Sequence, residues 1–261
     1  MTDTPRIPRG TTPEGARSEA ETSRYVREMF GRIAPRYDLL NHVLSMQIDR
    51  LWRRRVTRRL RAILDRPDAL VLDLCCGTGD LSLALARAGQ ARVIAADFVH
   101  GMLVRAREKL SSALGDESEN APVARWSIVE ADALRLPFAD SSFDLLTAAF
   151  GFRNLANYEA GLLEFLRVLK PGGTVAILDF TEPRSRLFGA LYRWYFRKIL
   201  PRIGGLISGD SSAYTYLPAS VSKYLQPADL AALLQQSGYT NIRYEVWTGS
   251  TVALHIARRP S

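Results

Sequence analysis

Between residues 69 and 180 the chain alternates short apolar runs with amphipathic segments, and this alternation limits the possible folds more than any other feature. The apolar runs are typical of buried strands, at residues 69–74, 92–96, 126–130, 143–149 and 174–180. The segments between them have the apolar spacing of helices, at residues 80–88, 101–114 and 158–169. Strands that alternate with helices make right-handed crossovers, which place the strands in one parallel sheet covered on both faces. We therefore predict an α/β fold with a doubly wound, mostly parallel sheet of the Rossmann-like kind.

The ends of the chain add to this core. Residues 227–237 read as a helix, and residues 241–247 and 251–258 as an antiparallel hairpin, which brings the sheet to seven strands. Residues 25–34 and 49–64 read as helices, while residues 1–23 are polar and rich in proline and are expected to form a disordered tail. We predict a single domain over residues 24–261, with an N-terminal helical cap at 24–66 and an inserted lid at 182–225.

Composition excludes several classes of protein. The 261 residues are 47% hydrophobic and 24% charged, the balance of a globular protein. No apolar run approaches the roughly 18 residues of a membrane span, and the N-terminus lacks the apolar region of a secretory signal. The adjacent Cys75 and Cys76 are poorly placed to bridge each other and have no metal-site spacing around them, so we expect a reducing, cytoplasmic location and no metal.

The net charge of +8 is concentrated in one helix. Seven arginines fall within twelve residues: Arg50, Arg53, Arg54, Arg55, Arg58, Arg59 and Arg61. Such a segment suits nucleic acid, an anionic membrane surface or an acidic ligand, and it also occurs as an ordinary solvated face.

A glycine-rich turn follows the first strand. Gly77 and Gly79 stand where the backbone can pass close to a ligand at a helix N-terminus, although the same spacing also serves tight packing of strand against helix. Asp97 lies at the end of the second strand, where a carboxylate can accept hydrogen bonds from both hydroxyls of a ribose. The Gly-x-Gly-x-x-Gly spacing of dinucleotide sites is absent, so NAD is disfavoured.

Two further carboxylates complete the candidate site. Asp73, in the first strand, and the amides of the turn suit a cofactor with an amino-acid head group. Asp132 follows the third strand and can accept from the exocyclic amine of an adenine. Ligands of such sheets bind outside the carboxyl ends of the strands. The sequence therefore predicts one pocket at this edge, suited to S-adenosylmethionine.

The motifs of the chain resemble those of class I S-adenosylmethionine-dependent methyltransferases, in particular the family that C-methylates the quinone ring in menaquinone and ubiquinone biosynthesis. The resemblance covers about residues 25–258. It is carried by Met29-Phe30 with residues 33–41, Ser45 and Trp52; by 72–74 with 77–80; by 150–154; by 167–173; by Tyr216-Leu217 with Ser220-Val221; and by 253–255.

This resemblance implies cofactor contacts at Thr78, Asp97, Asp132 and Ala133, which agrees with the pocket inferred from the strand ends. The chain departs from the family pattern at four positions. Asp49 stands where a His is usual, Asp179 and Thr181 stand where Glu and Ser are common, and Ala149 stands where some members place a Ser against the cofactor.

For the chemistry, a quinol ring carbon becomes nucleophilic when a neighbouring hydroxyl is deprotonated, which calls for a base or for a stabilising positive charge. We hypothesise that Arg153 supplies this charge, that Asn154 orients the ring oxygen, and that Tyr37 closes over the pocket. The alternative interpretations are a helix-capping or surface ion-paired arginine and a packing tyrosine. His255 alternates with apolar residues and fits a sheet histidine better than a base.

The predicted reaction is methylation of demethylmenaquinol to menaquinol with S-adenosylmethionine as donor. The alternatives are the ubiquinone precursor 2-polyprenyl-6-methoxy-1,4-benzoquinol, another small molecule, or RNA. Because a polyprenyl quinol resides in the membrane, the arginine-rich helix and an aromatic, basic helix at 187–200 are candidates for transient docking on an anionic surface at its inner face. A nucleic-acid partner is not expected, because the arginine run lacks interleaved aromatic residues. A homo-oligomer remains open.

Overall fold

The computed structural model describes residues 10–13, 15–38, 47–115, 125–183, 189 and 212–261. Its centre is a seven-stranded sheet in the order β3-β2-β1-β4-β5-β7-β6. The strands are β1 (Leu70–Leu74), β2 (Arg92–Asp97), β3 (Trp126–Glu130), β4 (Phe143–Ala149), β5 (Leu169–Phe180), β6 (Thr240–Trp247) and β7 (Val252–Arg258). The predicted fold class is confirmed.

The pairing of the strands fixes where a ligand can bind. Strands β1 to β5 pair in parallel, whereas β7 lies antiparallel between β5 and β6, as the predicted hairpin requires. The chain runs from β1 outward to β2 and β3 and then returns to the other side of β1 as β4. In open α/β sheets this reversal leaves a crevice at the carboxyl ends of the two central strands.

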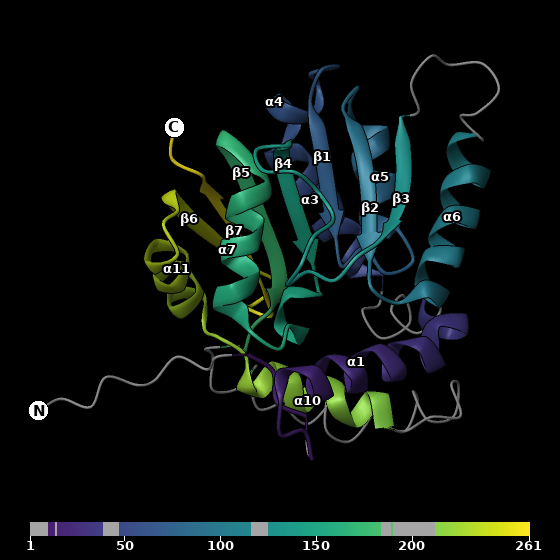
Figure 1. Ribbon diagram of the computed structural model, residues 1–261, viewed down its shortest axis with the longest axis vertical. Helices are drawn as coiled ribbons and strands as arrows, with labels where there is room; N and C mark the ends of the chain where they lie inside the picture. The colour runs from purple at the N-terminus through teal and green to yellow at the C-terminus, as the bar shows by residue number, and fades with distance from the viewer. Residues whose placement is uncertain (1–9, 14, 39–46, 116–124, 184–188, 190–211) are drawn as a thin grey trace, which may run out of the picture.

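Helices cover both faces of the sheet (Figure 1). On one face α7 (Tyr158–Val168) and α11 (Pro227–Gln236) bury Leu162, Phe165 and Leu234 against the strands. On the other face α3 (Ile48–Arg59), α4 (Arg61–Leu64) and α5 (Asp80–Ala88) bury Trp52 and Leu85, and α6 (His100–Leu114) packs beside α5 against β2 and β3. Burial on both faces explains why the central strands read as continuous apolar runs.

Two helices close the edge of the sheet at which the parallel strands end. Helices α1 (Glu19–Ile33) and α10 (Ser212–Lys223) lie side by side across this edge (Figure 1). The rings of Tyr25 and Tyr216 connect them, with centroids 6.1 Å apart. Of the cap predicted at residues 24–66, α1 covers this edge of the sheet. Helices α3 and α4 do not, because they pack on a face of the sheet.

The predicted disordered tail is wrong for its described part. Helix α1 begins at Glu19, where the Ser18 hydroxyl accepts from the Glu21 N–H at 3.2 Å. Further upstream the Thr11 N–H donates to the Leu155 carbonyl oxygen at 2.9 Å. Residues 10–13 thus form a strap over the segment that follows β4. The predicted helix at 187–200 and most of the predicted lid lie outside the described residues.

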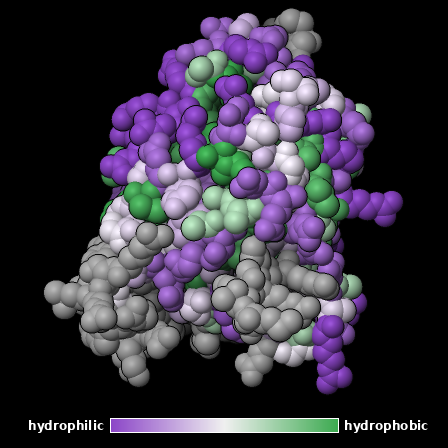
Figure 2. Space-filling model, turned by 90° about the vertical axis from the view of Figure 1, so that its left-hand side faces the viewer, coloured by the Kyte–Doolittle hydropathy of each residue, from purple (hydrophilic) through white to green (hydrophobic). Residues whose placement is uncertain are grey.

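The face of the molecule beside α11 and β6 is largely polar. Figure 2 faces the side that carries α11 and the edge strand β6, where hydrophilic residues predominate and apolar residues form small separate patches. Tyr244 and Val246 on β6 are among the exposed large apolar residues. Within the described ranges, no helix is long and apolar enough to cross a membrane.

Candidate active site

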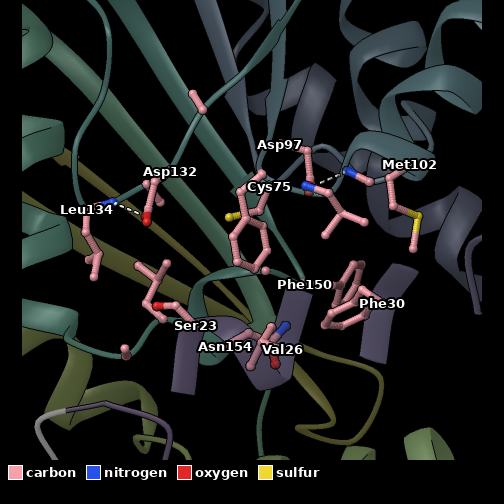
Figure 3. Close-up of a pocket in the computed structure, with 18 of the residues that line it drawn as sticks. Ser23, Val26, Phe30, Cys75, Asp97, Met102, Asp132, Leu134, Phe150 and Asn154 are labelled. Atoms are coloured by element: carbon pink, nitrogen blue, oxygen red, sulfur yellow. Dashed lines mark hydrogen bonds between the residues drawn. The ribbon is translucent and has the colours of Figure 1, made fainter. Parts of the chain in front are cut away.

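A cavity opens at the reversal point of the sheet, between the strand ends and helix α1 (Figure 3). It encloses about 700 Å³, counting the space open to solvent at its mouth. Its walls come from the turn after β1, the ends of β2 and β3, the start of α6, the segment after β4, the inner side of α1, and Tyr37 beyond α1. Six of the predicted site residues line it: Tyr37, Gly77, Asp97, Asp132, Ala133 and Asn154. The cavity therefore lies at the edge of the sheet where the sequence predicted a pocket.

The base of the cavity is made by two turns in close contact. Cys75 after β1 and Phe150 after β4 both have left-handed backbones, with φ of 53° and 61°. A Cβ on Gly151 would lie 2.2 Å from the Cys75 Cβ, so only glycine allows the two turns to approach this closely. Residues held in such unfavourable conformations cluster at ligand sites, because the surrounding fold must enforce them.

Asp97 links the second strand to the glycine turn. Its carboxylate accepts the Gly77 N–H and the Val99 N–H, both at 2.9 Å. Burial raises the pKa of Asp97, and the backbone N–H donors partly offset this effect. A carboxylate has about four acceptor positions, so Asp97 retains capacity for ribose hydroxyls while it fixes the turn.

Asp132 and Ala133 line the cavity beyond β3. The Asp132 carboxylate accepts the Leu134 N–H at 2.9 Å, which fixes the side chain at the cavity wall (Figure 3). Ala133 is buried and its neighbour Leu134 presents an apolar side chain to the same wall. A polar group next to an apolar wall suits the edge and face of a purine ring.

Asp73 does not reach the cavity, contrary to the sequence prediction. Its carboxylate is 1% exposed and accepts from the Ser82 hydroxyl at 2.5 Å and the Thr147 hydroxyl at 2.7 Å. Burial raises the pKa of Asp73 to about 6, against the opposing effect of these two hydrogen bonds. Asp73 therefore supports the turn from below by tying β1 to α5 and β4.

Thr78 and Gly79 also lie behind the cavity wall. The Thr78 hydroxyl donates to the Asp38 carboxylate, and Lys109 contacts Asp38 at 2.7 Å and Asp80 at 2.6 Å. Gly79 has φ +81°, and a Cβ there would lie 3.1 Å from the Ala106 Cβ. Gly79 thus serves close packing, but of the start of α5 against α6 and not of strand against helix as the sequence suggested, while Thr78 joins the N-terminal segment to the turn.

Arg153 is a buried ion-paired residue, and its side chain lies outside the cavity lining. Its Nη1 contacts the Asp179 carboxylate at 2.8 Å, with the two side chains 5% and 2% exposed. Burial lowers the pKa of Arg153, but the charge of Asp179 and the hydrogen bond to it outweigh this and raise it overall. Asp179 also accepts the Arg153 backbone N–H at 2.9 Å, so the pair fixes the 3-10 turn η2 (Phe152–Asn154).

Asn154 and Tyr37 do line the cavity. The Tyr37 ring packs edge-on against Phe30, with centroids 6.1 Å apart, and a Cβ on Gly77 would lie 3.6 Å from its Cε1. Tyr37 therefore lies next to the glycine turn, and its closing over the pocket stays a prediction. Asn154 lies at the α1 side of the cavity, and its amide oxygen accepts from the Tyr216 hydroxyl at 3.0 Å.

His255 belongs to the sheet and lies away from the cavity. It is buried, its Nε2 lies 2.8 Å from the Pro227 carbonyl oxygen, and burial lowers its pKa to about 4. Cys75 lines the cavity, and burial raises the thiol pKa of both cysteines. Among the described residues no group of three or more His, Cys, Asp and Glu side chains could hold a metal.

Sequence reasoning missed the contribution of α1. Ser23, Val26 and Phe30 line the cavity, and none was a candidate, because the helix was expected to begin at Tyr25 and to act only as a cap. A signal was present in the sequence: Ser18 followed by Glu21 marks a helix start, and Thr22, Val26, Met29 and Ile33 then share one buried face.

The cavity fits S-adenosylmethionine. Gly77 leaves open a place that a side chain would fill, Asp97 has acceptor capacity at the end of β2, and Asp132 stands at an apolar wall. Asp97 and Asp132 would hold the ribose and the adenine, and the open turn at Gly77 would admit the methionine portion. Bound there, the cofactor supplies an electrophilic sulfonium methyl group.

Structural comparison places the fold among methyltransferases and related proteins. The [4+2]-cyclase SpnF has a TM-score of 0.66 at 17% identity, covering 94% of this chain and 98% of SpnF. The Haemonchus contortus phosphoethanolamine N-methyltransferase 2, solved in complex with S-adenosyl-L-methionine, has a TM-score of 0.55 at 15% identity, covering 78% of this chain and 53% of that protein. These likenesses concern the fold alone.

Sequence comparison gives closer relatives. Demethylmenaquinone methyltransferase of Thermus thermophilus is 47% identical over 89% of this chain and 100% of its own length, and that of Deinococcus radiodurans is 47% identical over 85% and 88%. A ubiquinone/menaquinone biosynthesis C-methyltransferase UbiE of Syntrophotalea carbinolica is 41% identical over 88% and 92%. The model of the ubiE/COQ5 methyltransferase family matches residues 18–259. The chain therefore belongs to the ubiE/COQ5 family and is a methyltransferase that uses S-adenosylmethionine as its methyl donor.

Proposed function

We propose that this enzyme methylates a ring carbon of a polyprenyl quinol, converting demethylmenaquinol to menaquinol. The observation that carries the proposal is the 47% identity to a demethylmenaquinone methyltransferase over that protein's full length. The second candidate is the ubiquinone precursor, which the relative named for both pathways favours.

The cavity divides in a way that suits this reaction. Gly77, Asp97 and Asp132 form the donor half, whereas Val26, Phe30 and Asn154 lie on the α1 side. An apolar wall that also carries the Asn154 amide and the Ser23 hydroxyl suits a flat aromatic ring with polar substituents. We assign the α1 side to the acceptor ring.

In this assignment the protein contributes mainly geometry. The turn after β1 and the segment after β4 hold donor and acceptor in line and limit access of water, and such alignment contributes roughly 7 to 11 kcal/mol in favourable cases. Asn154 donates a hydrogen bond to the ring oxygen, which stabilises the negative charge that develops there. Tyr37 covers the donor half, while Arg153 acts as a positioning residue, because Asp179 offsets its charge and the pair fixes the turn that carries Asn154.

The direct test is an assay of the purified protein with S-adenosylmethionine and three acceptors in separate reactions. These are demethylmenaquinol, 2-polyprenyl-6-methoxy-1,4-benzoquinol and total RNA, with products identified by mass spectrometry. We expect a mass increase of one methylene on the demethylmenaquinol. Methylation of the benzoquinol or RNA alone would transfer the proposal to that substrate.

We further propose that the enzyme works in the cytoplasm and docks transiently on the inner face of the membrane through α3. Arg50, Arg54 and Arg58 recur every fourth residue along the exposed side of this helix. The helix begins near the cavity, because the Trp52 ring lies 5.8 Å from the ring of Phe150. Each arginine near an anionic surface contributes about 1 kcal/mol of binding.

Vesicle sedimentation tests this docking surface. The variant Arg50→Glu/Arg54→Glu should bind vesicles that contain anionic lipid at least about thirtyfold more weakly than the unmodified protein. The matched control is Arg92→Glu/Arg258→Glu, which makes the same change in charge at exposed positions on the opposite edge of the sheet. Equal loss in both variants would mean that only net charge matters and that α3 is not the docking surface.

A further inference from the structure

Three polar side chains from distant parts of the chain form a row of hydrogen bonds that ends in the cavity. The Tyr216 hydroxyl, on α10, donates to the Asn154 amide oxygen at 3.0 Å. The Thr11 hydroxyl, in the N-terminal strap, lies 3.2 Å from the Tyr216 hydroxyl. The row therefore joins residues 11, 216 and 154, and only Asn154 lines the cavity.

The direction of these hydrogen bonds follows from the number of protons. A tyrosine hydroxyl has one proton, and in Tyr216 it is used toward Asn154, so Thr11 must be the donor to Tyr216. Burial raises the pKa of Tyr216, so its hydroxyl stays protonated near neutral pH, even though the hydrogen bond with Thr11 acts in the opposite direction. Both members of the row are thus fixed as donors toward Asn154.

This arrangement determines which end of the amide of Asn154 is available. With the oxygen occupied by Tyr216, the NH₂ group is left for a ligand. Figure 3 shows the amide nitrogen on the side of Phe30 and Phe150 and the oxygen turned away from them. Without the Tyr216 donor the amide could rotate by 180° and present an acceptor, which would repel a developing phenolate.

The strap that carries Thr11 is held firmly against the same segment. The Thr11 N–H donates to the Leu155 carbonyl at 2.9 Å, and Gly10 lies so close to Ala156 that a Cβ would be 2.0 Å from its carbonyl oxygen. Tyr216 is 9% exposed and packs against Tyr25. The row is therefore part of the packed structure and does not depend on a chance surface contact.

We propose that Thr11 and Tyr216 are positioning residues that hold the Asn154 amide with its NH₂ group toward an oxygen atom of the acceptor. The inference rests on the proposed function in one respect, the assignment of the α1 side of the cavity to the quinol. It adds that the N-terminal strap, which does not itself line the cavity, controls recognition of the acceptor.

Kinetics with separate variants test the proposal. Tyr216→Phe should lower kcat/KM for the quinol about tenfold, the value of one lost hydrogen bond to an oriented group, with the affinity for S-adenosylmethionine changed less than twofold. Thr11→Val should give a smaller loss of kcat/KM. Thr11→Ser should retain the kcat/KM of the unmodified protein, because it keeps the hydroxyl donor. The double variant Thr11→Val/Tyr216→Phe should be no worse than Tyr216→Phe alone, since both act through one hydrogen bond.

The control is Tyr239→Phe, which removes a buried tyrosine hydroxyl that donates to the Leu162 carbonyl at 2.9 Å, away from the cavity. It should leave kcat/KM unchanged. Losses that multiply in the double variant, or a parallel loss of cofactor affinity, would overturn the proposal in favour of a general structural role.

A measurement without substrate separates this inference from the proposed function. In protein labelled with ¹⁵N-asparagine, Tyr216→Phe should shift the side-chain NH₂ signal of Asn154, assigned by its loss in Asn154→Ser, and Tyr239→Phe should not. If the signal shifts but the unmodified protein does not methylate demethylmenaquinol, the substrate assignment fails and the orienting role stands. If the signal does not shift, the inference fails whatever the substrate.

Discussion

Replacing Arg153 by Met tests whether this residue serves mainly to stabilise the fold through its ion pair with Asp179. Its ion pair with Asp179 is 2.8 Å long, with the side chains 5% and 2% exposed, so Arg153→Met leaves a buried carboxylate without its counter-charge. Removal of one partner of such a pair costs about 3 to 5 kcal/mol of unfolding free energy. At roughly 2 to 4 °C per kcal/mol this lowers Tm by about 6 to 20 °C.

The double variant Arg153→Met/Asp179→Asn removes both charges and keeps one side-chain oxygen, which can accept the backbone N–H of residue 153 as Asp179 does now. The Phe180 N–H loses its acceptor, because it is bound by the other carboxylate oxygen. We expect the double variant to recover most of the lost stability, because the penalty comes from the uncompensated charge. Urea unfolding followed by circular dichroism measures all three proteins. The reasoning is refuted if Arg153→Met unfolds within 1 kcal/mol of the unmodified protein, or if the double variant is no more stable than Arg153→Met.

Methyl transfer, measured at a temperature where all three proteins are folded, then distinguishes two roles of Arg153: positioning the turn and stabilising the phenolate. If the ion pair positions the turn before Asn154, the double variant retains methyl transfer, because the turn is restored. If the positive charge itself stabilises the phenolate, transfer stops in both variants while S-adenosylmethionine still binds. Calorimetric titration with the cofactor supplies the control for an intact donor half.

Three further predictions concern the donor half. Burial raises the pKa of Asp73 to about 6, so between pH 4 and 6 the folded state holds a proton that the unfolded state releases. The stability that this proton provides is complete below about pH 4 and is lost as the pH rises through 6. Asp73→Asn should therefore reduce the fall in unfolding free energy that urea titrations measure between pH 4 and 8. Gly79→Ala should lower Tm by several degrees more than Gly172→Ala, because both have positive φ but only Gly79 has a close neighbour, the Ala106 Cβ at 3.1 Å; equal effects would contradict the packing role. Asp97→Asn should weaken S-adenosylmethionine binding about ten- to a hundredfold by calorimetry, because hydrogen bonds to a charged acceptor are lost, and a change below threefold would remove Asp97 from the ribose site.

The sheet and the donor side of the cavity could be predicted from the sequence. Strands buried on both faces read as apolar runs, and the carboxylates at their ends, Asp97 and Asp132, necessarily meet at one edge because parallel strands end together. The same reasoning could not distinguish a side chain that points into the cavity from one that points below it. Asp73 lies inside β1, where alternate residues face opposite sides, and its direction depends on Ser82 and Thr147.

The acceptor side could not be predicted in the same way, because its contacts join residues far apart in the chain. Thr11 and Tyr216 are separated by 205 positions, and neither lies in a periodic pattern that indicates a partner. The prolines and polar residues before Ser18 resemble a disordered segment in composition, and the strap is held by contacts with distant parts of the chain, the segment after β4 and Tyr216 on α10. Arg153 was recognised from its motif, but only the fold shows that Asp179 offsets its charge.

The separation of the two halves of the cavity along the chain bears on how such enzymes can be redesigned. Gly77, Asp97 and Asp132 come from one continuous stretch, which also carries Asn154. The α1 wall and the two residues that hold the Asn154 amide, Thr11 in the strap and Tyr216 on α10, come from pieces that flank that stretch in the sequence. Exchanging the two flanking pieces together between homologues would transplant the α1 wall and the contacts that hold Asn154, while leaving the methyl-donor module untouched. Exchanging either piece alone would split the Thr11–Tyr216 contact between two parental sequences, so functional chimeras should inherit both pieces from one parent.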